Sequence, residues 1–483
     1  MTFSVAEILA SMLLYLALLF GVGLLAERGK LPRKLLDHPA IYVLSLGVIA
    51  GGLAIYGASQ LAYQYGYNFL IYYAGISLML LLSPLLMYPV MRICRIYQLS
   101  SLADLLTFRF RSPWIGALVT ATLLAAVLPL LALQIELVFG VTHLLSGDRE
   151  SFEHETRVHD VLAFVFCILV ATFTIYFGAR RLKPEERHEG LVTAIAFESL
   201  VKMLALLALG LYAVYEIFGG FSGLDRWLAS NPAVVDTLHT PLRRDSAHAM
   251  LLIFFAGTVT MPHIFHMAFS EGPDGRRLRA ASWGLTSYLF MLSLPILPIT
   301  WAGIALGSQL PQVYSALALG LDSGSRAMSL TAFIAGMSAA SAVIIVSTLA
   351  LANMCLKHLV LPLQLRGKSG LEAAPDIYSQ LNWLRAALTG AIILAGFLFA
   401  RTVRSHEMLV ELGLTAFIGT LQFLPGLLAT IYWPRANRYG LTAGLVGGFI
   451  TWYLAVVLPL LSGADPVLRG ILLDWFDIRD QVW

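Results

Sequence analysis

The sequence predicts an all-helical protein that crosses a membrane many times. Of its 483 residues, 58% are hydrophobic and only 13% are charged, whereas a soluble globular chain carries about 25% charged residues. A spanning helix needs roughly 20 mostly apolar residues, and twelve stretches meet or approach this requirement. They lie at residues 6–25, 40–62, 68–91, 114–139, 160–177, 190–217, 248–269, 283–306, 328–353, 384–401, 408–432 and 440–462.

The two ends of the chain need separate interpretation. The first stretch lacks a preceding basic segment and is too long for the apolar part of a secretion signal, so we expect it to be a retained span. After twelve spans the tail returns to the starting side. Its last residues, Asp474 to Trp483, are polar and aromatic. We expect at least one further span beyond them, with a natural external tail as the alternative.

Basic residues are distributed unequally between the two sides of the membrane. The loops that follow the odd-numbered spans hold about two thirds of the 32 Lys and Arg residues. Because positively charged loops remain in the cytoplasm, the pattern predicts a cytoplasmic location for these loops and an external N-terminus.

Two spans contain residues that interrupt helices. The second span has Gly47, the pair Gly51-Gly52 and Gly57, and the seventh runs from Gly257 to Pro262 through two threonines. Interrupted helices at matching positions of two halves indicate the binding site of an inverted-repeat transporter. Ordinary glycine-mediated helix packing is the alternative.

The matching breaks divide the chain, read as one transmembrane transporter domain over 1–483, into unequal parts. We expect an extra first helix and loop at 1–39, a first repeat of five spans at 40–217, and a second repeat at 248–432. The region 440–483 then adds one helix and the external tail.

Four motifs occur in the order found in the sodium/solute symporter family. They are Ser101 with Asp104 at the start of a basic amphipathic helix, the stretch from Pro129 to Gln134, the triplet Met261-Pro262-His263, and the run from Ala335 to Ser341. Together they resemble that family over about residues 40–460. The resemblance implies a LeuT-type 5+5 inverted repeat with an extra N-terminal helix, and transport by alternating access.

A narrower resemblance comes from residues 179–199. Ala179-Arg180-Arg181-Leu182, Glu186 to Leu191 and Ala196 to Ser199 are similar to the transporter-like membrane domain of CbrA-type sensor histidine kinases. This implies a bacterial inner-membrane location and cytoplasmic histidine-kinase domains, either fused or coupled.

Glu198 and Lys202 are ionisable residues well inside the sixth span. At 1.5 Å per residue they lie roughly 12 and 18 Å from the start of the span, where ionisable groups are costly and indicate function. Their spacing places them on one helix face. We expect a coupling role, with a structural ion pair as the alternative.

The resemblance also implies a sodium site. Its ligands fall on the carbonyls of Gly47 and Ala50 and the hydroxyls of Ser338 and Ser341. Ala339 stands where the family has a further hydroxyl, and a hard cation needs several oxygens. Coupling to either Na⁺ or H⁺ therefore stays open, and small-residue packing is the other interpretation of the serines.

Polar side chains in apolar spans provide candidates for the solute site. Tyr56, Gln134, Thr258 and Gln422 lie on spans two, four, seven and eleven, and small-molecule pockets combine apolar walls with a few such groups. For each of them a packing role is the alternative. His263 and His266 are one turn apart and titrate near neutral pH, but two ligands do not make a metal site.

These observations predict a secondary transporter that binds and imports an amino acid. The narrower resemblance makes L-histidine the leading candidate, with proline or another solute as the alternative. A sensor of the same fold with little transport is the second hypothesis. No nucleophile–base pair, phosphate loop or metal cluster is found in the sequence, so we expect neither an enzyme nor a cofactor beyond the coupling ion. The partners expected are the solute and the bilayer, not a nucleic acid.

Overall fold

The computed structural model describes a helical protein without strands in the ranges that it covers, as predicted. These ranges are residues 2–147, 157–178, 188–240, 244–271, 275–363, 377–403 and 409–461. Within them, nine helices are long and apolar enough to cross a membrane, or up to 11 if each of two bent pairs is one span. The tail from Asp474 to Trp483 and most of the 179–189 motif lie outside the described residues.

Each predicted span corresponds to helical structure. Six spans are single long helices: α1 (Val5–Glu27), α8 (Pro113–Leu145), α9 (Arg157–Gly178), α10 (Glu189–Tyr212), α18 (Arg326–Cys355) and α20 (Ile377–Thr402). The others are made of successive pieces: α3 (Pro39–Leu46) and α4 (Ala58–Tyr65), α5 (Leu70–Leu81) and α6 (Met87–Ile96), α13 (Arg244–Thr260) and α14 (Pro262–Phe265), α15 (Gly275–Ser293) and α16 (Ile296–Ala305), α21 (Leu409–Leu421) and α22 (Leu424–Tyr432), and α23 (Arg438–Trp452) and α24 (Leu458–Leu461).

The third span differs from its prediction as one helix over 68–91. The helix stops at Leu81 and resumes at Met87. Pro84 lies in the intervening turn, and proline has no amide hydrogen with which to continue a helix. Hydrophobicity persists through this turn, which is why the apolar run alone suggested one continuous helix.

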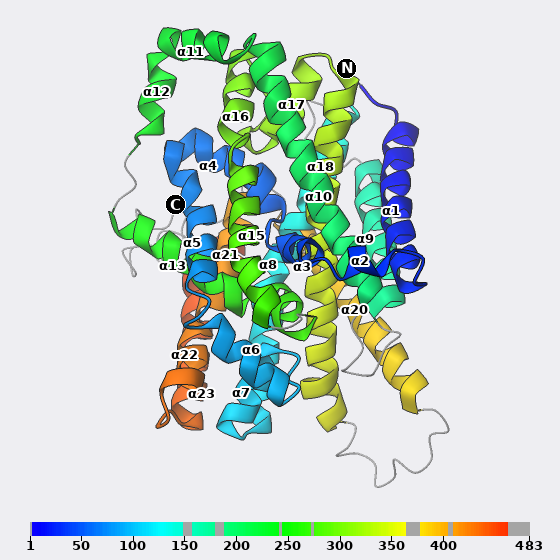
Figure 1. Cartoon of the computed structure of the whole chain (residues 1–483), viewed down its shortest axis with the longest axis vertical. Coiled ribbons are helices and arrows are strands. Elements are labelled where there is room, and N and C mark those ends of the chain that lie inside the picture. Colours follow the sequence, from blue (N-terminus) through cyan, green and yellow to red (C-terminus); the bar gives the residue numbers. More distant parts are fainter. Residues whose placement is uncertain are drawn as a thin grey trace.

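Connections between spans contain helices that the sequence pattern did not reveal. The short helices α11 (Phe221–Ser230), α12 (Pro232–Leu238) and α17 (Ser315–Asp322) belong to two of them. Helices α11 and α17 lie at the same end of the molecule as the N-terminus (Figure 1), whereas α6 and α7 (Leu102–Phe110) lie toward the opposite end. This separation agrees with the alternation of loops predicted from the basic residues.

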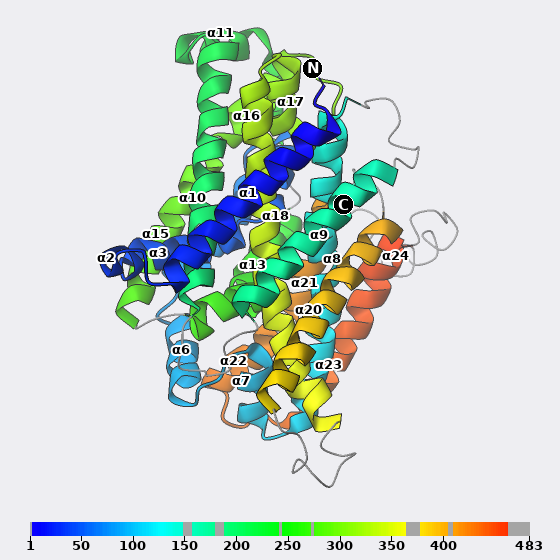
Figure 2. The ribbon, with the colours of Figure 1, turned by 90° about the vertical axis from the view of Figure 1, so that its right-hand side faces the viewer.

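The centre of the protein is formed by α18, which packs against both α8 and α10. In α18, 94% of the most apolar 18-residue window is buried, compared with 33% for α1 and 28% for the α23 span. Figure 2 shows α18 running through the middle of the bundle, with α10 on one side and α9 on the other. Helix α1 and helix α23 therefore lie at the periphery, with most of their surface facing outward.

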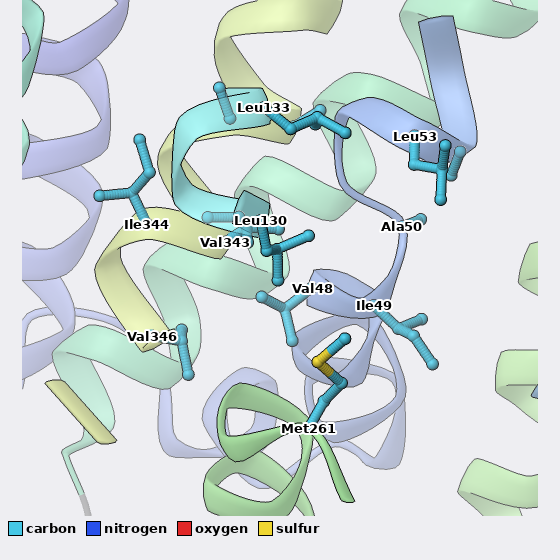
Figure 3. Close-up of a cluster of buried hydrophobic side chains, with 14 of the residues drawn as sticks. Val48, Ile49, Ala50, Leu53, Leu130, Leu133, Met261, Val343, Ile344 and Val346 are labelled. Carbon is cyan, nitrogen blue, oxygen red and sulfur yellow. The ribbon is translucent and has the colours of Figure 1, made fainter. Parts of the chain in front are cut away.

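Both predicted interruptions are present. The second span bends by 74° between Ile49 and Leu53, and the seventh bends by 47° at Met261. A Cβ atom on Gly51 would lie 2.7 Å from Val343, and one on Gly52 would lie 2.8 Å from Leu137. Glycine is therefore required where the unwound segment approaches α18 and α8. Figure 3 shows Ala50 on this non-helical segment, with Val48, Ile49 and Met261 close by.

The end of the molecule that contains α6 and α7 carries the basic loops and is called the basic end below. A buried carboxylate stabilises it. The hydroxyl of Ser101 accepts a hydrogen bond of 3.1 Å from the Asp104 amide, which confirms the predicted helix start. The Asp104 carboxylate lies 2.9 Å from both Lys357 and His358 at the end of α18. Burial alone would raise the pKa of this carboxyl, but these two residues outweigh burial and hold it well below its usual range.

We predict that Asp104→Asn lowers the free energy of unfolding at pH 7 by about 1–3 kcal/mol, the worth of hydrogen bonds to a charged group. Because the folded-state pKa is depressed, this stabilisation is complete above the unfolded value, about 3.9, and disappears as pH falls through the folded value. Melting temperatures of purified wild type and variant should converge only below about pH 4. A difference that is already absent at pH 6 would contradict the assignment.

A second prediction concerns orientation. Single cysteines replacing Tyr97 and Ser222, which are exposed at opposite ends of the molecule, should be labelled from opposite sides. An impermeant thiol reagent added to intact cells should label Ser222→Cys only, and labelling of Tyr97→Cys should require permeabilised cells. The native Cys94, Cys167 and Cys355 are buried, so wild type serves as the control. The reverse pattern would invert the predicted topology.

Candidate functional site

The ammonium group of Lys202 lies at the break in the second span. Lys202 is fully buried on α10, and its Nζ donates hydrogen bonds of 3.1 Å to the Gly47 carbonyl and 2.9 Å to the Ala50 carbonyl. Where a membrane helix unwinds, its carbonyls lose their helical partners and need other donors. Three of the six predicted ion-site residues, Gly47, Ala50 and Lys202, are thus in direct contact. The nitrogen of Lys202 binds the two carbonyls as a cation would.

Hydroxyls from α5 bind two further carbonyls in and beside this segment, in addition to its local backbone hydrogen bonds. Tyr72 donates to the carbonyl of Ile49 at 2.9 Å, and Tyr73 donates to that of Ala54 at 2.6 Å. Together with Lys202 they replace the helical hydrogen bonds that the bend removes. The unwound segment is therefore fixed by side chains of two neighbouring helices.

Glu198 lies one turn before Lys202 and accepts hydrogen bonds from the two predicted serines of α18. The hydroxyl of Ser341 donates to Glu198 Oε1, and that of Ser338 donates to the Glu198 carbonyl at 2.6 Å. Glu198 Oε2 is buried and has no hydrogen-bond partner among the described residues. The structure thus gives Glu198 and Lys202 different partners, whereas their spacing had suggested that each neutralises the other directly.

The peripheral helix α1 also reaches this site. The hydroxyl of Tyr15 donates a hydrogen bond of 3.1 Å to Glu198 Oε1, and Tyr15 is itself buried. No sequence pattern indicated this contact, because 183 positions separate the two residues and tyrosines are common in apolar spans. The extra first helix therefore supplies a hydrogen-bond donor to the buried carboxylate.

Gln134 lies on the other side of the same break. Its Oε1 accepts a hydrogen bond of 3.0 Å from the Gly52 amide. Its Nε2 is buried and has no hydrogen-bond partner among the described residues. An unpaired buried amide donor is costly, so this group is available to an acceptor on a bound solute.

Tyr56 lies on the part of the second span that follows the break. Its hydroxyl donates to the Ala332 carbonyl at 2.7 Å, and its ring meets that of Tyr314 edge-on at 6.1 Å. Tyr56 also lines a crevice with Gly52, Leu133 and Val313 that contains about 170 Å³ of empty space but is too narrow for a water molecule. The conformation described is thus closed around this part of the candidate solute site.

The other two predicted solute residues, Thr258 and Gln422, form hydrogen bonds within their own spans. The hydroxyl of Thr258 donates to the Phe254 carbonyl within its own helix. Gln422 donates to the Gly419 carbonyl, and its Oε1 lies 3.0 Å from the position of a Cβ on Gly448 of α23. Gln422 therefore faces the peripheral helix, which the apolar pattern of its span could not reveal.

Comparisons with known proteins establish the fold. No protein-family model and no curated protein matches the chain, whereas 69 solved chains do. One of these covers 92% of this chain and 97% of its own length, with a TM-score of 0.64 and 13% sequence identity. It is described as the substrate-bound, outward-open state of a Na⁺-coupled sialic acid symporter. The protein therefore has the LeuT-like fold of membrane symporters.

Proposed function

We propose that the protein is a secondary transporter that imports a small amino acid, with a proton as the coupling ion. The observation that carries this proposal is the Lys202 ammonium on the carbonyls of Gly47 and Ala50. These are the carbonyls that the sodium/solute symporter resemblance assigns to Na⁺. A covalently attached cation now holds that position.

A sodium ion and this ammonium cannot share the site. Two unit charges about 4 Å apart repel each other by about 4 kcal/mol at an effective dielectric constant of 20. The hydroxyls of Ser338 and Ser341 are also engaged by Glu198. Sodium coupling, the property of the similar symporter, would require Lys202 to leave these carbonyls.

Protonation of Lys202 provides an alternative to sodium binding. In the charged form, the ammonium satisfies two carbonyls of the unwound segment and holds the second span against α10. A neutral amine binds these carbonyls less strongly, because charge-assisted hydrogen bonds are roughly twice as strong. Loss of the proton therefore favours a different arrangement of the break, which is the property that a coupling ion needs. Glu198 balances the charge nearby.

The solute site is proposed on the opposite side of the break. The unpaired Nε2 of Gln134 donates to a solute carboxylate, beside the half-helix that starts at Leu53. Broken helices of this fold bind anionic and cationic substrate groups at their ends. L-Histidine is the leading candidate from the CbrA-type resemblance. A sensor that binds the solute with little transport is the rival hypothesis, and uptake by purified protein separates the two.

Removal of the Lys202 ammonium gives the first functional prediction. Lys202→Ala should expose the carbonyls of Gly47 and Ala50 and create a site that Na⁺ stabilises. Thermal unfolding of the variant should then depend on Na⁺, by about 2.7 kcal/mol at a concentration 100 times the Kd. Lys202→Met, which fills the space without a charge, is the matched control and should not respond. Uptake by wild type should respond to a protonophore and not require Na⁺.

The opposite result in wild type would refute proton coupling. That result is uptake that collapses without Na⁺ and ignores a protonophore when the membrane potential is clamped.

Gln134 gives the second functional prediction. Purified protein should bind L-histidine, and Gln134→Ala should weaken binding by roughly 1–3 kcal/mol, the cost of an unpaired buried polar group. Gln422→Ala is the control, because its side chain faces α23, and it should leave the Kd unchanged. Isothermal titration measures both. Saturation with proline and no heat with histidine would replace the substrate while leaving the fold and the site intact.

A further inference from the structure

A second group of titratable residues lies at the basic end of the molecule, where the seventh span ends and α10 begins. Glu271 follows the last turn of the seventh span and is buried. Its Oε1 lies 2.6 Å from Nδ1 of His188 and 3.4 Å from Nε2 of His266. Its Oε2 accepts a hydrogen bond of 3.0 Å from the backbone amide of His188. One carboxylate oxygen therefore bridges two imidazoles, one from the start of α10 and one from the seventh span.

A further histidine connects this group to the break in the second span. His263 precedes His266 by one helical turn and lies on α14, which packs against the turn Gly47–Ile49, whose Gly47 carbonyl binds the Lys202 ammonium. Its Nδ1 is buried and has no hydrogen-bond partner among the described residues. Exposure rises along the series, from 0% at Lys202 to 2% at His263 and 4% at His266, and reaches 14% for the His188 side chain. The series thus leads from the most buried cation toward the protein surface.

These residue types are suited to moving a proton. A neutral imidazole has one nitrogen that accepts a proton and one that donates, and histidine titrates near physiological pH. Burial alone would raise the pKa of Glu271, but its hydrogen bonds with His188 and the nearby imidazole of His266 outweigh burial and hold it well below its usual range. Glu271 therefore carries a negative charge between proton transfers and takes up the proton only in passing. Arg92 and Arg95 of α6, which packs against this turn, are exposed.

We propose that His263, His266, Glu271 and His188 form the path by which the coupling proton passes between Lys202 and the basic end of the protein. Lys202 gives a proton to Nδ1 of His263, which releases its other ring proton toward His266, directly or through a water molecule. His266 passes a proton from Nε2 to Glu271 Oε1, and Glu271 passes it to Nδ1 of His188. Each transfer breaks one N–H or O–H bond as the next forms. The path rests on the proposed proton coupling.

Two modes of transport by the purified protein in proteoliposomes test this path, with radiolabelled L-histidine as the probe. Net uptake driven by a pH gradient requires the proton to leave at each cycle. Exchange of external for internal histidine does not, because the loaded carrier returns without releasing it. Glu271→Gln should therefore reduce net uptake by at least tenfold and leave exchange within about twofold of wild type. Glu271→Asp, which retains a carboxylate, should restore part of the net uptake.

Asp104→Asn is the matched control. Asp104 is the other buried carboxylate that contacts a histidine at this end, and it lies outside the path. This variant should change exchange and net uptake by the same factor.

Each alternative outcome contradicts a specific claim. If Glu271→Gln reduces exchange and net uptake equally, Glu271 is only a structural contact and the path is wrong. The path is also wrong if the variant accumulates histidine as wild type does. Wild-type uptake that is insensitive to the pH gradient would instead overturn the proposed proton coupling, and this result is seen without any variant.

Discussion

The carbonyls that become free where the second span unwinds impose the main constraint on this structure. In a bilayer interior each of them needs a donor, because water is absent and an unsatisfied group costs several kcal/mol. The donors come from side chains of other helices, namely Lys202 on α10 and Tyr72 and Tyr73 on α5. The break is therefore also the point at which neighbouring helices are joined to the second span.

Burial of Lys202 requires a nearby negative charge, since an isolated ion in this environment would be prohibitively costly. Glu198 provides it from the same helix, and hydroxyls of Tyr15 and Ser341 fix its carboxylate. These contacts connect three elements that are distant in sequence: the extra first helix, the sixth span and the ninth. A change of charge at Lys202 would thus affect the hydrogen bond of the peripheral helix as well as the contacts of the core.

The basic end repeats the same chemistry nearer the surface. Asp104 and Glu271 are both buried carboxylates held ionised by contacts with His or Lys. Asp104 joins α7 to the end of α18, and Glu271 joins the seventh span to the start of α10. Lys202 lies on α10, and His263 lies on the seventh span. The Glu271 contact therefore joins the two elements that carry these residues, whereas the Asp104 contact joins α7 to α18.

The sequence alone determined the helical class, the spans, the two broken helices and the ionisable pair in the sixth span, because hydrophobic runs, glycines and buried charges are local signals. It also suggested Gln134 as a candidate site residue, and the family resemblance added the serines of the ninth span and the carbonyls of Gly47 and Ala50; their roles stay predictions. Only the tertiary structure decided the partners. It placed Lys202 on the carbonyls, turned Gln422 toward α23 and brought Tyr15 to Glu198, since side-chain direction and contacts across about 180 positions depend on how the helices pack.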